Sequence, residues 1–178
     1  VQLDFVQPEN FHLRYTGIDG KEQAPAVLHV TILGSVERFM GILIEHFAGS
    51  FPLWLAPTQI ALIPVSETHL DAVQSLQNFL LKSTDKLDIP LRIAIEETGD
   101  TVSAKIRRAA FQKIPYTIVI GDKEIPQNQK WSPTDSITLR AFGQKNTEIS
   151  TLENFSNLLI QKIESKICRQ QNTASKTP

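Results

Sequence analysis

The sequence is poor in cysteine and contains no long apolar run. Its single cysteine, Cys168, excludes an internal disulfide framework and a thiolate zinc cluster, and it is typical of a reducing compartment. No apolar run approaches the roughly 18 residues that a membrane helix needs, and no signal peptide is recognisable, so we expect no membrane association. The first residue is Val1 rather than Met, and it leads directly into a strand-like run, which we interpret as the start of an excerpt or a processed product.

The sequence also lacks a strong net charge, since 18 basic and 19 acidic residues leave −1 over 178 residues. Residues 101–145, however, contain 8 basic side chains against 3 acidic ones, a net +5 that leaves −6 for the rest of the chain. A positive face on a nearly neutral protein indicates a polyanionic partner, and chance clustering on a solvated face is the alternative. The 8 basic residues are Lys105, Arg107, Arg108, Lys113, Lys123, Lys130, Arg140 and Lys145.

The first third of the chain has the pattern of a small antiparallel sheet followed by a helix. Three short alternating runs, at residues 2–6, 11–15 and 27–32, predict three strands at a sheet edge. A helical pattern follows from Gly34 and ends at Gly49. The apolar, proline-bracketed connector 51–57 then marks a domain boundary. The apolar face of the predicted helix comprises Phe39, Ile42, Leu43, His46 and Phe47.

From Gln59 onward, strand-like and helical patterns alternate. This alternation predicts an α/β domain with a mixed sheet of about five strands and three helices. We therefore divide the chain into residues 1–56, residues 57–169 and a disordered tail at 170–178. The predicted strands are 60–65, 91–95, 116–120 and 136–140, and the predicted helices are 67–82, 101–113 and 152–167.

Arg38 and His29 in the first part are candidate ligand-binding groups. The turn before the predicted helix has small residues, Gly34 and Ser35, which allow a flat ligand to lie against the backbone. Arg38 in the first helical turn could bind a phosphate through its planar guanidinium, although a surface pair with Glu37 is the commoner use of such a residue. His29 is by its residue type alone more often a core or edge histidine than a metal ligand.

These segments together resemble a known family. The blocks of the first part closely resemble the third signature motif of class II aminoacyl-tRNA synthetases in its threonyl form, preceded by a strand similar to Gln2-Leu3-Asp4-Phe5. The later blocks resemble the anticodon-binding domain of the same family. The first set comprises residues 28–39, 41–49 and 51–57, and the second set comprises residues 105–107, 115–116 and 121–124.

The resemblance implies roles for four residues of the first part. Arg38 matches the arginine that binds the ATP γ-phosphate, Gln2 a glutamine beside the aminoacyl-adenylate, and Ser35 the small residue beneath it. His29 matches one of three ligands of a zinc ion that holds threonine, so it would bind zinc only with ligands from outside this chain. ATP with Mg²⁺ and Zn²⁺ are thus implied for the parent enzyme. The sequence departs from the family at Val30 and Thr31, where the family usually has Arg and Ala.

In the second part, the resemblance implies an anticodon site. Glu124 matches a glutamate that accepts hydrogen bonds from N1 and N2 of the middle anticodon guanine of threonine tRNAs. Arg140 and Lys113 match residues that contact the anticodon bases, and we expect all three at the ends of neighbouring elements. Gly99 replaces a family asparagine, and Trp131 could stack on a base or pack in the core. Lys105, Arg107 and Arg108 are expected to contact phosphates.

The sequence therefore predicts part of a threonine–tRNA ligase of protein biosynthesis, cytoplasmic or organellar. The parent would be a homodimer that activates threonine with ATP and transfers it to tRNA(Thr). This chain would supply the ATP-binding element of motif three and anticodon recognition, and it would be inactive alone because motifs one and two are absent from its residues. The alternative is a non-catalytic nucleic-acid-binding module or an accessory subunit derived from a synthetase.

Overall fold

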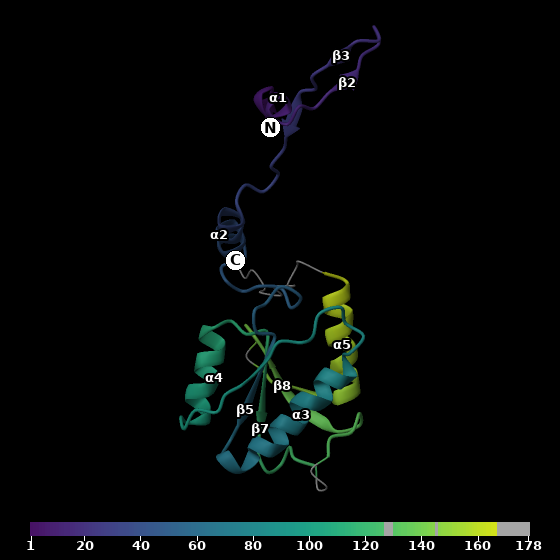
Figure 1. The fold of residues 1–178 in the computed structure, drawn as a ribbon. Helices are drawn as coiled ribbons and strands as arrows, with labels where there is room; N and C mark the ends of the chain where they lie inside the picture. The colour runs from purple at the N-terminus through teal and green to yellow at the C-terminus, as the bar shows by residue number, and fades with distance from the viewer. Residues whose placement is uncertain (127–129, 145, 167–178) are drawn as a thin grey trace, which may run out of the picture. The chain divides into compact units, whose positions relative to one another are not determined.

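The computed structural model describes residues 1–126, 130–144 and 146–166. The chain divides into two compact units, Val1–His46 and a second unit that begins at Phe47 (Figure 1). The expected tail at 170–178 and Cys168 lie outside the described residues. None of the described helices is long and apolar enough to cross a membrane.

The first unit contains two separate two-stranded sheets instead of one three-stranded sheet edge. One sheet pairs β1 with β4 and the other pairs β2 with β3, both antiparallel. The unit also contains the helices α1 and α2. The bounds are β1 Gln2–Asp4, α1 Val6–Asn10, β2 Tyr15–Thr16, β3 Glu22–Gln23, β4 Val27–His29 and α2 Val36–His46.

The difference from the predicted strands has a local cause at Asp4. Its Oδ1 accepts hydrogen bonds from the backbone N–H of Val6 at 2.8 Å and of Gln7 at 3.0 Å. A side chain that accepts these otherwise unpaired donors starts a helix, so the strand predicted over 2–6 stops at Asp4. The strand predicted over 11–15 is also wrong, because His12 adopts a φ of 54° in the turn that closes α1.

The helix predicted after Gly34 is confirmed as α2. Gly34 has a φ of 73°, a conformation that favours glycine, and the Ser35 hydroxyl oxygen accepts a hydrogen bond from the Arg38 backbone N–H at 3.3 Å. The turn and the cap thus start α2 at Val36. Within Val1–His46, every residue of which is described, only Pro8 is buried, so the apolar face of α2 has no cover from its own unit.

The second unit is built on a mixed sheet with the order β6-β5-β7-β8-β9 in the described residues. β5 is parallel to β6 and β7, and β8 is antiparallel to β7 and β9. The five-stranded α/β fold is confirmed, and β9 is a strand that the sequence pattern did not predict. The strands are β5 Ile60–Pro64, β6 Ile93–Ile95, β7 Tyr116–Ile120, β8 Ser136–Ala141 and β9 Glu148–Thr151; the helices are η1 Glu67–His69, α3 Leu70–Ser83, α4 Val102–Phe111 and α5 Leu152–Glu164.

Helices cover the two faces of this sheet unequally. Figure 1 shows α3 and α5 on one side of the sheet and α4 on the other. The α3–α5 side holds the main apolar core, whereas Ala61, Ala109 and Ile114 form a small cluster under α4. The fully buried side chains of the main core include Ile60, Leu62, Val73, Leu76, Leu80, Ile118, Ile120, Phe155 and Leu159. Trp131 also packs there at 8% exposure and donates to the Ala72 carbonyl at 2.9 Å, so its role is core packing and not base stacking.

The connector before β5 belongs structurally to the second unit. Arg92 donates from Nε to the Ala56 carbonyl at 2.9 Å and from Nη2 to the Trp54 carbonyl at 3.0 Å. Gln59 donates from Nε2 to the Leu53 carbonyl at 2.9 Å. These bonds join residues 53–56 to the sheet, which places the limit of the compact unit at Phe47, ten residues before the boundary expected from composition.

Candidate nucleic-acid interface

The first unit places Gln2 and His29 side by side. They are directly opposite partners in the β1–β4 ladder, and such partners project to the same face. The His29 ring lies 3.3 Å from Asp4, measured from Nε2 to Oδ2. The pKa of Asp4 is lowered mainly by the Gln7 and Val6 N–H groups and to a smaller extent by His29. His29 is therefore held by a carboxylate that also accepts hydrogen bonds from the first two N–H groups of α1.

The described residues hold no cluster of metal ligands around His29. Among the residues that the structure describes, no group of three or more His, Cys, Asp or Glu side chains could hold a metal ion. His29 offers one imidazole beside one carboxylate, and a single imidazole does not hold Zn²⁺ tightly.

The start of α2 presents Arg38 to solvent. A Cβ added at Gly34 would lie 3.4 Å from Arg38 Cδ, so the arginine stem runs close over the glycine. Ser35 caps the helix, and the pKa of Glu37 is lowered by its own backbone N–H and by the Ser35 hydroxyl. An exposed guanidinium at a helix start, where the helix dipole also favours negative charge, is a suitable arrangement for a phosphate.

In the second unit, Lys105 does not lie where a phosphate contact would need it. The side chain is only 4% exposed, and its Nζ donates to the Pro64 carbonyl at 3.1 Å. The cavity beside it, about 260 Å³, is also lined by the acidic residues Glu67, Glu97 and Asp100, which disfavour an anion. The expected phosphate contact of Lys105 is therefore replaced by a structural role at the end of β5.

Arg108 is also occupied, whereas Arg107 is exposed. Arg108 donates to Glu96 at 2.8 Å and forms a second ion pair with Asp100. These partners raise the pKa of Arg108, with Asp100 contributing most, and the same ion pair lowers the pKa of Asp100. Of the three expected phosphate contacts, Arg107 alone keeps an exposed cation without an ion-pair partner in the described residues.

Lys113 binds the first residues of the second unit instead of standing free. It follows α4 with a φ of 56°, and its ammonium group donates to the Ala48 carbonyl. It also lines a pocket of about 280 Å³ with Gly49, Phe51 and other connector residues. The helix predicted over 101–113 ends at Phe111, because the left-handed conformation of Lys113 cannot continue α4.

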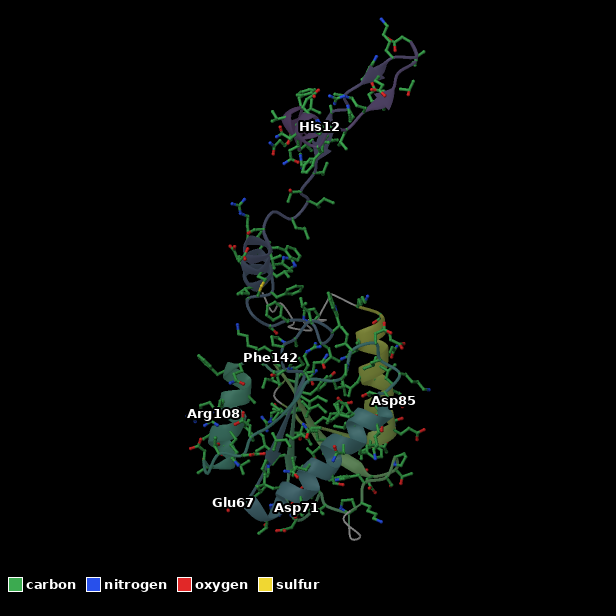
Figure 2. The ribbon with its side chains drawn as sticks, viewed as in Figure 1. His12, Glu67, Asp71, Asp85, Arg108 and Phe142 are labelled. Atoms are coloured by element: carbon green, nitrogen blue, oxygen red, sulfur yellow. The ribbon has the colours of Figure 1, made fainter. Side chains whose placement is uncertain are left out.

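Arg140 and Glu124 lie at opposite ends of β7, contrary to the expected cluster. Arg140 pairs with Thr117 near the start of β7, whereas Glu124 follows Gly121 after its end. Thr117 and Gly121 are four residue steps apart, about 13 Å at roughly 3.3 Å per step. In Figure 2, Phe142 marks the Arg140 end of the sheet and Glu67 marks the end near Glu124.

The surroundings of Glu124 and of Arg140, at the two ends of β7, differ. Glu124 closes a tight turn, because its N–H donates to the Gly121 carbonyl at 3.1 Å while its Oε2 accepts from the Gly121 N–H at 3.0 Å. Arg140 is half-buried on the sheet face that α4 shares, and near it Ile149, the partner of Thr138, is 74% exposed. The face of β8 and β9 beside α4 is thus open to a ligand.

The structure joins His69 and Asp122, two residues that no pattern in the sequence singles out as a pair. The buried His69 ring lies 3.0 Å from Asp122, measured from Nε2 to Oδ1, although 53 residues separate the two. Their bond connects the loop after β5 to the turn that carries Glu124. A serine three residues before a histidine at a helix start, Ser66 and His69, was the available signal for a capping arrangement.

Comparison with known proteins agrees with this architecture. A family model described as "Anticodon binding domain" matches residues 59–162. The chain is 37% identical to a threonine–tRNA ligase of Caldanaerobacter subterraneus over 166 residues and 39% identical to that of Geobacillus kaustophilus over 170 residues. These alignments cover 93% and 95% of the chain but 24% of each relative, so the chain spans about a quarter of their length.

A solved structure is also similar. It is described as the RNA binding domain of threonyl-tRNA synthetase from Cryptosporidium parvum Iowa II, with a TM-score of 0.64 and 28% identity. The match covers 90% of this chain and 38% of that one. Because the family model covers more than half of the chain and coincides with the five-stranded α/β unit, the chain belongs to the anticodon-binding domain family.

Proposed function

We propose that the chain is part of a threonine–tRNA ligase and contributes anticodon recognition together with one ATP-binding element. The observation that carries this proposal is the extent of the similarity. The family model begins at residue 59, but the alignments with the two threonine–tRNA ligases named above leave 12 and 8 of the 178 residues uncovered. Most of Val1–His46 is therefore also related to these enzymes.

The surface of the first unit supports its assignment to a larger core. Large apolar side chains of its strands and of α2 are more than half exposed, although such side chains are normally part of a core. They are Leu3, Leu28, Met40 and Ile42. An apolar surface of this kind marks an interaction site. We propose that the remaining catalytic domain of the enzyme covers it, and that the parent acts as a homodimer.

In this proposal the first unit contributes to adenylate formation. Arg38 would stabilise the charge on the γ-phosphate of ATP, Ser35 would keep the turn beneath the adenylate small, and Gln2 would contact the adenylate. His29 would complete a zinc site only with ligands from elsewhere in the enzyme, and Mg²⁺ would accompany ATP. The enzyme would act in translation, in the cytoplasm or an organelle.

The second unit would hold the anticodon loop of tRNA(Thr) at two places. Glu124 would accept hydrogen bonds from the middle guanine at the carboxyl end of β7. Arg140 would contact another part of the loop across the open face of β8 and β9, since the two residues lie at opposite ends of β7. Arg107 would contact a backbone phosphate, which positions the RNA without reading its sequence.

The direct test is binding of the 178-residue chain to anticodon stem-loops, measured by fluorescence anisotropy. We expect weak, salt-sensitive binding to a stem-loop of threonine tRNA with guanine in the middle position. The same stem-loop with adenine there should bind at least several-fold more weakly. Equal affinities for the two loops would contradict anticodon recognition by this chain.

The chain alone is expected to be catalytically silent. Adenylate formation needs groups that are not among these residues, and a single imidazole does not form the metal site. Threonine-dependent exchange of pyrophosphate into ATP should therefore stay at background, and the purified chain should hold less than one zinc ion at micromolar free metal. Threonine-dependent exchange above background, or stoichiometric zinc, would show this prediction to be wrong.

The arginine pair of α4 offers a second test with a matched control. Arg107→Ala should reduce the slope of log affinity against log salt concentration by about 1, because one phosphate contact is lost. Arg108→Ala removes the same charge, but Glu96 and Asp100 already neutralise it, so the slope should change little. Salt titrations of stem-loop binding measure both slopes. Equal reductions would show that Arg108 also reaches the RNA.

A further inference from the structure

The loops after β5 and β7 leave the sheet side by side. The Val65 N–H donates to the Ile120 carbonyl at 2.9 Å, which extends the β5–β7 ladder to the edge of the sheet. A Cβ added at Gly121 would lie 3.1 Å from the Val65 side chain, so the two loops are in contact where they begin. Any group that joins them farther out fixes the turn 121–124 relative to the sheet.

His69 is that group, and its bonds determine its tautomer. The side chain is 7% exposed, and Nδ1 accepts a hydrogen bond from the Ser66 backbone N–H at 3.1 Å. A backbone N–H can only donate, so Nδ1 carries no proton in the neutral ring and Nε2 carries it. Nε2 therefore donates to Asp122 Oδ1 at 3.0 Å.

The Ser66 side of the ring belongs to the start of a helix. The Ser66 hydroxyl lies 2.8 Å from Nδ1 and 2.6 Å from the Thr68 hydroxyl. Ser66 and His69 thus form a reciprocal cap of η1, just before α3. The cap holds the imidazole in one orientation, which leaves its Nε2–H pointing at the neighbouring turn.

The tip of the turn on the other side is exposed, whereas Ile125 beyond it packs against the main core. Asp122 is 97% exposed, and in the part of the chain that the structure describes the turn is closed by the two hydrogen bonds between Gly121 and Glu124. An exposed carboxylate normally has many orientations open to it. The buried donor of His69 selects one of them and so anchors the tip of the turn two residues before Glu124.

We infer that His69 is a positioning residue for anticodon recognition: through Asp122 it fixes the turn that presents the Glu124 carboxylate to the base. This inference rests on the proposed function, because it deepens the role given there to Glu124. It extends the recognition apparatus to the loop after β5, to which the proposed function assigns no RNA contact.

The variants that test this separate the anchor from the fold. Asp122→Ala removes the acceptor at an exposed position, so folding is not at risk. Asp122→Asn keeps an acceptor oxygen for Nε2–H and should retain the anchor. His69→Asn places an acceptor near the Ser66 N–H but is too short to reach Asp122. Asp71→Ala removes an exposed carboxylate from the first turn of α3, at the same end of the unit in Figure 2, and serves as the charge-matched control.

Two quantities are measured on the 178-residue chain. One is the hydrogen-exchange rate of the Gly121 amide, observed by NMR, and the other is the affinity ratio between stem-loops with guanine and adenine in the middle position. Asp122→Ala and His69→Asn should each raise the exchange rate and lower the affinity ratio, both by about three- to tenfold, as expected for one lost hydrogen bond. The double variant should lose no more than either single variant, since both break one bond. Asp122→Asn and Asp71→Ala should stay within about twofold of the unaltered chain, as changes outside the anchor do.

The outcomes separate the positioning role from the proposed function. Unchanged exchange and an unchanged affinity ratio in Asp122→Ala would overturn the positioning role. A loss in Asp71→Ala as large as in Asp122→Ala would overturn it as well, because general electrostatics would then explain both. A third outcome concerns Glu124 itself. If Asp122→Ala speeds Gly121 exchange but Glu124→Gln leaves the guanine-to-adenine affinity ratio unchanged, the anchoring of the turn is supported. Glu124 is then overturned as the base-reading group.

Discussion

Replacing Glu124 by Gln is expected to lower the affinity for a stem-loop with guanine in the middle position by about 1–3 kcal/mol, roughly five- to 150-fold. The substitution keeps the size of the side chain. Its amide oxygen can still accept from the Gly121 N–H, which Oε2 accepts now at 3.0 Å, so the turn survives. The amide NH₂ then faces N1 and N2 of guanine, which are themselves donors.

The loss should depend on the base. A stem-loop with adenine in the middle position presents a different edge, so Glu124→Gln should cost it little or even raise its affinity. Arg107→Ala serves as the control, because loss of a phosphate contact weakens all loops alike. Anisotropy titrations of both variants against both loops form the complete experiment. If Glu124→Gln lowers both affinities by the same factor, Glu124 is a surface charge and not a base reader.

The placement of the charged residues shows where sequence reasoning reached its limit. The two carboxylates that neutralise Arg108 belong to Glu96 and Asp100. Both lie just before residues 101–145, so the count of +5 leaves them out. Proximity in space, not in sequence, decides which charges cancel. A local charge count therefore overstated the positive face of α4, and the exposed cation that remains on it for RNA is Arg107.

Lys105 illustrates a second limit. The pattern of α4 was interpreted with every charged residue outward, but lysine can bury its aliphatic stem if its ammonium finds a partner. The Pro64 carbonyl at the end of β5 is that partner. Only the three-dimensional packing of α4 on β5 shows that an acceptor lies within reach, and no periodicity in the sequence contains this information.

The fold itself was largely predictable, with failures at weak patterns. The apolar strands β5 and β7 and the helix α5 were predicted close to their observed bounds, because buried elements have strong patterns. β9 was missed, since Glu148–Thr151 carries one large apolar residue, Ile149, and that residue is exposed. The direction of β8 was also not predictable from its pattern. Its antiparallel pairing with β7 is what places Arg140 far from Glu124.

Phe155→Ala is expected to have the largest effect on stability, a decrease of about 3–5 kcal/mol in the free energy of unfolding of the second unit. Phe155 in α5 is fully buried, and its ring contacts Tyr116 of β7 edge to face at 5.3 Å between centroids. Tyr116 in turn accepts a hydrogen bond from Lys162 at 2.7 Å. Removing the ring leaves a cavity between α5 and β7, the strand that pairs with β8 and its Arg140.

Phe111→Ala is the matched control, because it removes the same ring from a site that is 87% exposed at the end of α4. It should change the free energy of unfolding by less than about 0.5 kcal/mol. Urea unfolding followed by tryptophan fluorescence measures both variants, and both tryptophans, Trp54 and Trp131, lie in the second unit. Since Phe155 supports the sheet without touching the RNA site, stem-loop discrimination by the folded fraction should be retained in both variants. Similar losses of stability for Phe155→Ala and Phe111→Ala would contradict the assignment of α5 to the core.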